Sequence, residues 1–316
     1  MAGSAAPDTG GGATLRVGYS AWPGWFPLAV AEEQGIFEQA GVDVELTFFA
    51  DYIASLDALV AGSIDVNTQT LNDTIFGVAA GSQQRIFLTN DNSTGNDAII
   101  CDGSIGAVED LAGKSIAAEP GVVDHFLLLQ GLADAGLSED DIEFQGLPTA
   151  AAAAAFAGGQ FDCVGVFAPF TTQALAREGS HVLFSSADFP GAISDHFVAT
   201  AAAAEEHPEE LQKLVDAWYL TLDWIAANPE EATAIMAAAA EVTPEEYAAY
   251  AEGTTIFDAA QALDSFEDRP DDPTSLPEMA RRINPFLVSS GLTEQEADLT
   301  GLFVPEFTAA YVAAGG

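Results

Sequence analysis

Basic residues are scarce in this chain of 316 residues. It contains 8 lysines and arginines against 49 aspartates and glutamates, which gives a formal net charge of −41 at pH 7. This balance excludes the usual basic surface of a nucleic-acid partner and disfavours docking on anionic lipid. So acidic a chain favours a saline source, where salt screens the repulsion between like charges. A GC-rich genome that prefers Arg and Ala is the alternative explanation.

Cysteine and long apolar runs are equally scarce. Cys101 and Cys163 are too few for a disulfide framework or a zinc site; a single bridge is possible, but the pattern favours free buried thiols. No apolar run reaches the length of a membrane span. Residues 1–13 are small, polar and glycine-rich, so we expect a flexible linker there and no signal peptide within it. A signal or lipid anchor trimmed from the natural protein remains an open alternative.

Signatures of catalysis and of metal binding are missing. The chain has no nucleophile elbow, zinc-binding HExxH, phosphate loop or dinucleotide fingerprint. The dipeptides Asp124-His125 and Asp195-His196 place adjacent side chains on different faces, and no third ligand has coordinating spacing. We therefore predict no catalytic residue, no cofactor and no metal site, and we interpret both histidines as structural.

The first two thirds of the chain alternate between strand-like and helix-like patterns. Strands are predicted near 15–19, 42–46 and 85–90, and helices over 28–40, 53–61 and 71–80, with a similar succession from residue 99. This alternation predicts an α/β fold with mixed, mostly parallel sheets. Helices dominate after about residue 205, and capping-box spacing predicts two helix starts, at Thr243 with Glu246 and at Thr293 with Glu296.

Several of these stretches resemble one protein family. "LRVGYSAWPGWFPLAVAEEQGIFEQAGVDVEL", "ALVAGSIDV", "VEDLAGKSIA" and "AFAGGQFDCVGVFAP" are similar to elements of solute-binding proteins of ABC importers, in the nitrate/sulfonate/taurine/thiamine-pyrimidine superfamily. The resemblance covers residues 14 to 200 and fades in the helical tail. It implies a monomeric periplasmic or extracellular protein that closes around a small molecule and delivers it to a membrane permease.

A narrower branch of this family resembles the chain more closely. "GYSAWPGW", "DYIASLDAL", "DNSTGNDAII", "PGVVDHFLLLQGL" and "SADFPG" are similar to binding proteins encoded beside urea-carboxylase and guanidine-degradation genes. The chain departs from that branch at "FAPFTTQ" and "AISDHFVA", and both departures could alter the ligand.

The family implies a type II periplasmic binding fold with two lobes and two crossover strands. We expect the first lobe over residues 14–98 and 196–316, which include the C-terminal helices, and the second lobe over 99–195. Ligands of open α/β sheets bind beyond the carboxyl ends of the strands. Polar and aromatic residues at predicted strand ends are therefore candidate ligand contacts: Trp22, Trp25, Asp51, Asn72, Asp97 and Phe167. Asp124, in the first turn of a second-lobe helix, and Asp195, near the return crossover, are candidates as well.

These candidates favour a cationic or neutral nitrogen-rich solute, with guanidine as the first choice. Carboxylates pair with guanidinium-like N–H groups, and an aromatic face attracts a desolvated cation. An anion would require basic side chains or free backbone N–H groups, and basic side chains are rare here. Asp51 and Asp124 could equally be helix N-caps, and Trp25 could be a core residue. A nitrate, sulfonate, pyrimidine or urea-like ligand, a sensor domain without transport, or an enzyme such as a thiamine-pyrimidine synthase remain the alternatives.

Overall fold

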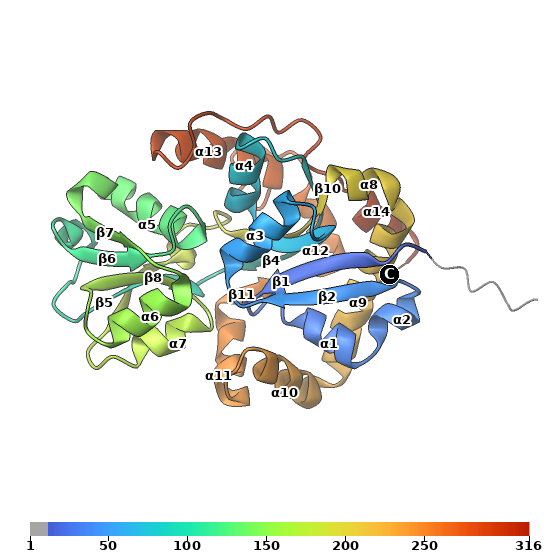
Figure 1. Cartoon of the computed structure of the whole chain (residues 1–316), viewed down its shortest axis with the longest axis horizontal. Coiled ribbons are helices and arrows are strands. Elements are labelled where there is room, and N and C mark those ends of the chain that lie inside the picture. The colour runs from blue at the N-terminus through green and yellow to red at the C-terminus, as the bar shows by residue number, and fades with distance from the viewer. Residues whose placement is uncertain (1–11, 316) are drawn as a thin grey trace, which may run out of the picture.

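Two β-sheets, each flanked by helices, form the body of the molecule. The computed structural model describes residues 12–315, so the linker expected over 1–13 lies almost wholly outside the described residues. The sheets sit side by side in two lobes, with the second sheet at the left of Figure 1. This is the predicted α/β, two-lobed fold.

The first sheet has the strand order β11-β4-β10-β3-β1-β2. Strands β1 and β2 pair in parallel, as do β1 and β3, whereas β10 runs antiparallel to both β3 and β4. Thus β1 to β4 all point the same way, whereas the inserted β10 and the edge strand β11, which is antiparallel to β4, are reversed. The bounds are β1 Leu15–Ser20, β2 Val44–Phe49, β3 Val66–Thr70, β4 Gln84–Ser93, β10 Ser194–Thr200 and β11 Thr254–Ile256.

The second sheet has the strand order β7-β6-β8-β5-β9. Its β6, β7 and β8 are parallel, and the reversed strand is β5, which is antiparallel to both β8 and β9. Each sheet is therefore mostly parallel in strand direction, as predicted, with a reversed strand at the crossover. The bounds are β5 Asp97–Cys101, β6 Ser115–Ala118, β7 Glu143–Gly146, β8 Cys163–Phe167 and β9 His181–Ser185.

Helices cover the sheets and make up most of the C-terminal part (Figure 1). The α-helices are α1 Pro27–Glu33, α2 Ile36–Ala40, α3 Tyr52–Val60, α4 Leu71–Ala79, α5 Val123–Asp134, α6 Thr149–Ala157, α7 Phe170–Leu175, α8 Ala201–Glu206, α9 Pro208–Ala227, α10 Pro229–Ala239, α11 Pro244–Ala249, α12 Ala259–Ser265, α13 Leu276–Ser289 and α14 Glu306–Ala313. Short 3-10 turns span Val108–Leu111, Glu139–Asp141, Ser186–Asp188 and Tyr250–Glu252.

Two local predictions were wrong. The helix expected over 28–40 is two helices, because Gly35 adopts a left-handed conformation (φ 63°) between α1 and α2. The capping box at Thr243 is confirmed, since its hydroxyl and the Glu246 carboxylate bond each other's backbone N–H groups. The second, at Thr293, is wrong: no helix begins there, and the Thr293 N–H bonds the carbonyl of Leu287 instead.

Two chain segments connect the sheets. Residues 94–96 lead from β4 to β5, and residues 186–193 lead from β9 back to β10. They are bonded to each other, because the Ser186 hydroxyl lies 2.7 Å from the Ser93 hydroxyl and accepts from the Gly95 N–H at 2.8 Å. The Asn96 amide donates to the Tyr250 carbonyl at 2.7 Å, so the helical tail also supports the connection.

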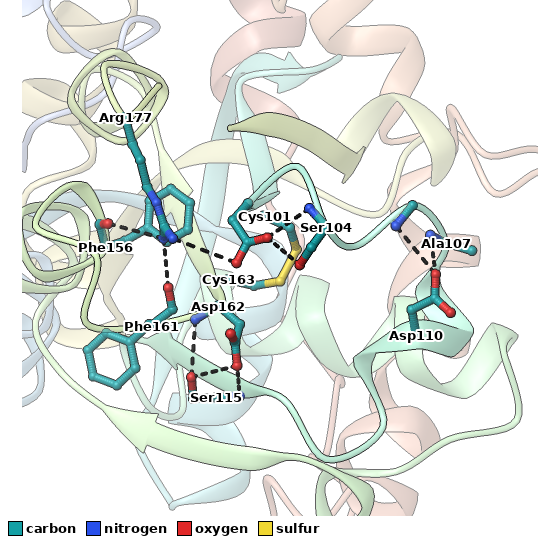
Figure 2. The surroundings of a disulfide bond; sticks show 12 residues. Cys101, Ser104, Ala107, Asp110, Ser115, Phe156, Phe161, Asp162, Cys163 and Arg177 are labelled. Atoms are coloured by element: carbon teal, nitrogen blue, oxygen red, sulfur yellow. Dashed lines mark hydrogen bonds and ion pairs between the residues drawn. A yellow bond between two sulfur atoms is a disulfide. The ribbon is translucent and has the colours of Figure 1, made fainter. Parts of the chain in front are cut away.

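Cys101 and Cys163 form a disulfide, shown in Figure 2. The prediction of free thiols was therefore wrong. The two residues are 62 apart in sequence but are direct partners in the antiparallel β5–β8 pair, with 4.0 Å between their Cα atoms. Strand register decides this pairing, and composition alone does not contain register.

The described helices include none that is long and apolar enough to cross a membrane.

Candidate functional site

The carboxyl ends of the parallel strands converge between the two sheets. In the first sheet, β1 ends at Ser20 and β3 ends at Thr70. Asp91 lies near the end of β4, and Asp195 is the second residue of the reversed β10. In the second sheet, β6 is followed by Glu119 and β8 ends at Phe167, beside the start of the reversed β5 at Asp97. Parallel topology thus brings residues from distant parts of the chain to one place.

A small cavity lies where these strand ends meet. Its lining comes from both sheets: Ala21, Trp22, Trp25, Tyr52, Thr70, Asp97, Val123, Phe167, Ile193 and Asp195. The empty space is about 220 Å³. So small a space disfavours a bulky solute. We call it the inner cavity.

Four aromatic side chains contribute to the inner cavity's wall. Trp22 and Phe167 meet edge to face with ring centroids 6.4 Å apart, Phe167 and Tyr52 do so at 6.2 Å, and Trp25 lies 5.5 Å from Tyr52. All four side chains are buried. The tight Trp-Pro-Gly-Trp turn therefore places two indole rings beside the cavity, where their faces can attract a desolvated cation.

Two buried carboxylates complete the lining. Asp97 is 2% exposed and Asp195 is 1% exposed, and one oxygen of each, Oδ2, has no hydrogen-bond partner. Burying an unpaired charge is costly unless a counter-charge arrives or the group is protonated. A cationic solute with N–H donors would supply that counter-charge.

Asp91 lies next to this pair without lining the inner cavity itself. Its carboxylate accepts from Trp22 Nε1 at 2.9 Å and from the Asn90 amide at 2.6 Å, and Asp91 lies opposite Asp195 in the β4–β10 pair. It packs so closely on Gly24 that a Cβ there would lie 1.9 Å from Asp91 Oδ2. A larger residue at position 24 would therefore displace the Asp91 carboxylate, which gives a reason for glycine at this place in the turn.

The carboxyl groups around the inner cavity have raised pKa values. Burial raises the pKa of Asp97 and of Asp91 to about 7, and does the same for Asp73, which also accepts from the hydroxyls of Tyr52 and Thr70. The pKa of Asp195 is well above its usual value, through burial and then the nearby charges of Asp91 and Asp97. Exclusion of water raises each of these pKa values, and the charges of neighbouring carboxyl groups add to the effect for Asp195.

A second cavity adjoins the first and shares Ala21, Tyr52 and Phe167 with it. Its other lining residues are Ser20, Ala50, Asp51, Glu119, Pro148, Thr149, Ala150 and Phe170. The empty space is about 320 Å³. We call it the outer cavity. In the described part of the chain, no lysine, arginine or histidine lines either cavity.

The structure brings most of the predicted site residues together. Five line the inner cavity: Trp22, Trp25, Asp97, Phe167 and Asp195. Asp51 lines the outer cavity and also caps α3, since its Oδ1 accepts from the Ile53 N–H. Asn72 and Asp124 line neither: the Asn72 amide donates to Asp73, and Asp124 accepts from the Thr149 hydroxyl at 2.9 Å.

The sequence-based selection missed Glu119, Thr149 and Thr70. Glu119 directly follows β6 and precedes a Pro-Gly turn, so the strand-end rule that selected Asp51 could have found it. Thr149 and Thr70 carry no comparable signal, because threonine at a helix start is ordinary capping.

His125 and His196 line neither cavity, and each ring is bonded to another side chain. His125 Nε2 lies 2.7 Å from Glu139, and its ring stacks on Phe144 with centroids 4.3 Å apart. His196 Nε2 lies 3.0 Å from the Ser194 hydroxyl, and burial lowers its pKa to about 3. Within residues 12–315, no three His, Cys, Asp or Glu side chains are grouped as metal ligands.

A family model described as NMT1-like matches residues 8–243. The chain belongs to the NMT1-like family. Among curated relatives, a Brucella abortus protein whose name gives binding as its role and no ligand is 28% identical over 229 residues, which cover 71% of this chain and 70% of the relative. The taurine-binding periplasmic protein of Escherichia coli is 27% identical over 209 residues, covering 65% of this chain and 64% of that protein.

Solved structures share the fold. The alkanesulfonate-binding protein of Xanthomonas axonopodis pv. citri bound to MOPS superimposes with a TM-score of 0.77 at 20% identity, covering 92% of this chain and 97% of that one. A desulfurization enzyme is also similar, with a TM-score of 0.66 at 17% identity, covering 96% and 99%. The fold is thus that of periplasmic binding proteins, and it alone does not decide between binding and catalysis.

Proposed function

We propose that this NMT1-like protein is the solute-binding component of an ABC importer, and that its solute is a small nitrogen-rich cation, with guanidinium the best fit. The observation that carries the proposal is the pair of unpartnered carboxylate oxygens, on Asp97 and Asp195, in a cavity walled by aromatic rings. Guanidinium offers planar N–H pairs to carboxylates and a flat face to indole rings.

The acidic lining argues against the ligands named for the relatives. A sulfonate or nitrate would need positive charge or several free N–H donors, whereas no basic side chain lines either cavity of the described chain. A sulfonate would be repelled by Asp97 and Asp195 whenever these carboxyl groups are ionised. The small volume also disfavours a bulky sulfonate.

A neutral urea-like solute is the second candidate. The indole N–H of Trp25 is buried without a partner and lines the inner cavity, so it could donate to a carbonyl oxygen. The urea N–H groups would then meet Asp97 and Asp195.

We also propose where the protein is located and with which partner it works. The protein would be periplasmic or extracellular, with lipid anchoring still to be tested, and would act as a monomer that presents its solute to a permease. It would bind the solute without converting it, in contrast to a synthase or desulfurization enzyme on the same fold.

Titration calorimetry tests the ligand directly. Guanidinium, urea, taurine, an alkanesulfonate and nitrate are titrated at matched ionic strength, and the recovered solute is checked for chemical change. We expect binding of guanidinium, strong loss in Asp97→Asn, and no loss in Asp162→Asn, which alters a partly buried carboxylate bonded to Ser115 away from both cavities. Binding of a sulfonate without guanidinium would overturn the proposal, and conversion of the solute would indicate an enzyme.

A further inference from the structure

The outer cavity carries its own set of acceptors, contributed by both lobes. Asp51 follows β2 of the first sheet, and Glu119 follows β6 of the second. Glu119 is 2% exposed, and its Oε2 accepts from the Thr149 hydroxyl at 2.6 Å. Burial raises the pKa of Glu119, and the charge of Asp51 and a hydrogen bond between the two carboxyl groups raise it further, so the pair shares a proton when no cation is present.

An independent polar group also lines this cavity without a partner. Ser20 is 1% exposed, and its hydroxyl oxygen makes no hydrogen bond. Thr149 donates to Glu119 Oε2 from its hydroxyl at 2.6 Å and from its backbone N–H at 3.4 Å. The other oxygen of Glu119, the Asp51 carboxylate and the Ser20 hydroxyl together form an acceptor set for an ammonium group.

We infer that the outer cavity is a second cation subsite, so that the preferred solute class is a guanidino or amidino compound with an amine on a short chain. This inference rests on the proposed function. The planar cationic end would occupy the inner cavity between Asp97 and Asp195, and the ammonium would lie between Asp51 and Glu119. Tyr52 and Phe167 line both cavities and would flank the linker.

Charge balance favours a dication over guanidinium alone. Asp51 and Glu119 belong to opposite lobes, so bringing them together without a cation requires a shared proton or places like charges face to face. An ammonium between them converts that repulsion into charge-assisted hydrogen bonds. The second subsite would thus favour the closed form of the protein as well as the longer solute.

Paired ligands separate the two subsites in calorimetry on the full chain. Guanidinium measures the inner cavity alone. An alkylguanidinium and an aminoalkylguanidinium with equal linkers, of about two to four methylenes, differ only in the terminal ammonium. We expect the ammonium to tighten binding about 10-fold to 100-fold at the best linker length, and Glu119→Gln to weaken binding of the aminoalkylguanidinium by a larger factor than binding of guanidinium.

The controls distinguish failure of this inference from failure of the proposed function. Glu139→Gln, which alters a glutamate of the same lobe bonded to His125, should keep the ammonium gain. Equal affinity for the two matched ligands, or an equal loss for guanidinium and the aminoalkylguanidinium in Glu119→Gln, would overturn the second subsite alone. If no cation binds the wild type, both proposals fall.

Discussion

At the residue scale, the important side chains are those whose polar atoms are buried without partners. Asp97, Asp195 and Trp25 each have such an atom in the inner cavity. Desolvating an unpaired carboxylate costs free energy that a folded protein must recover elsewhere. An unpaired group in a cavity recovers it when a ligand binds, which is why these atoms point to a binding site rather than to the core.

A substitution of Trp22 tests whether its hydrogen bond to Asp91 contributes to binding. In Trp22→Phe the ring remains but the indole N–H bond to Asp91 is lost, leaving a buried carboxylate short of a donor. We expect guanidinium affinity to fall about tenfold or more. Trp218→Phe is the matched control, because Trp218 is equally buried, its indole N–H is unpartnered and it lines neither cavity. Equal affinities in the two variants, measured by calorimetry, would contradict a supporting role for Trp22.

The raised pKa values predict how pH affects stability. Asp97 has a pKa of about 7 in the folded protein against 3.8 unfolded, so the folded state binds more protons between these values. Its contribution to the free energy of unfolding is full below pH 4 and is lost as pH rises toward 7, at roughly 1.4 kcal/mol per pH unit. Urea denaturation at pH 5 and pH 8 should show a smaller loss for Asp97→Asn than for wild type.

The same groups predict how pH affects binding. A cation favours the ionised carboxylates, so binding near neutral pH should release protons from the group formed by Asp73, Asp91, Asp97, Asp124 and Asp195, whose pKa values burial raises. Guanidinium affinity should therefore rise between pH 5.5 and 8, and the rise should be smaller in Asp97→Asn. An affinity independent of pH in the wild type would mean that the carboxyls titrate outside this window.

At the element scale, the strands were more predictable than their pairing. Period-two alternation located β1, and the strand-end rule selected Asp97 and Phe167, because topology places such ends together. Asp195 was selected from its position near the return crossover. The disulfide and the position of Asp91 opposite Asp195 could not be predicted, because both depend on the register between antiparallel strands. The Thr293 error has a related cause: capping spacing is local, and whether a helix follows depends on tertiary packing.

The disulfide offers a test of the β5–β8 pair. It closes a loop of 62 residues, so removing it should lower the free energy of unfolding by about 2 to 4 kcal/mol. A double Cys101→Ala, Cys163→Ala variant and the reduced wild type should lose comparable stability in urea denaturation. A reducing agent should then leave the double variant unchanged. A wild type insensitive to reduction would show that the bridge contributes little.

At the scale of the whole molecule, charge is the dominant feature. The ion pairs of the described chain, such as Arg16 with Asp65 and Arg282 with Glu278, engage few of the 49 acidic residues. The net charge is −41, so unpaired carboxylates repel one another across the surface. This repulsion opposes the compact state.

Salt should relieve this repulsion. The Debye length falls from about 10 Å at 0.1 M to about 3 Å at 1 M, so the melting temperature should rise by several degrees as NaCl increases over that range. Sucrose at equal osmolality is the control for general preferential exclusion. A melting temperature that is flat or falls with NaCl would remove the argument for a saline source.

The placement of Asp97 and Asp195 along the chain has a mechanical consequence. Asp97 comes directly after the first connecting segment, 94–96, and Asp195 comes two residues after the second, 186–193. One carboxylate thus belongs to each sheet, next to the backbone that must bend if the lobes part. If the lobes move apart, the two carboxylates separate. A cation bonded to both would therefore hold the lobes together, and its release would require the lobes to open.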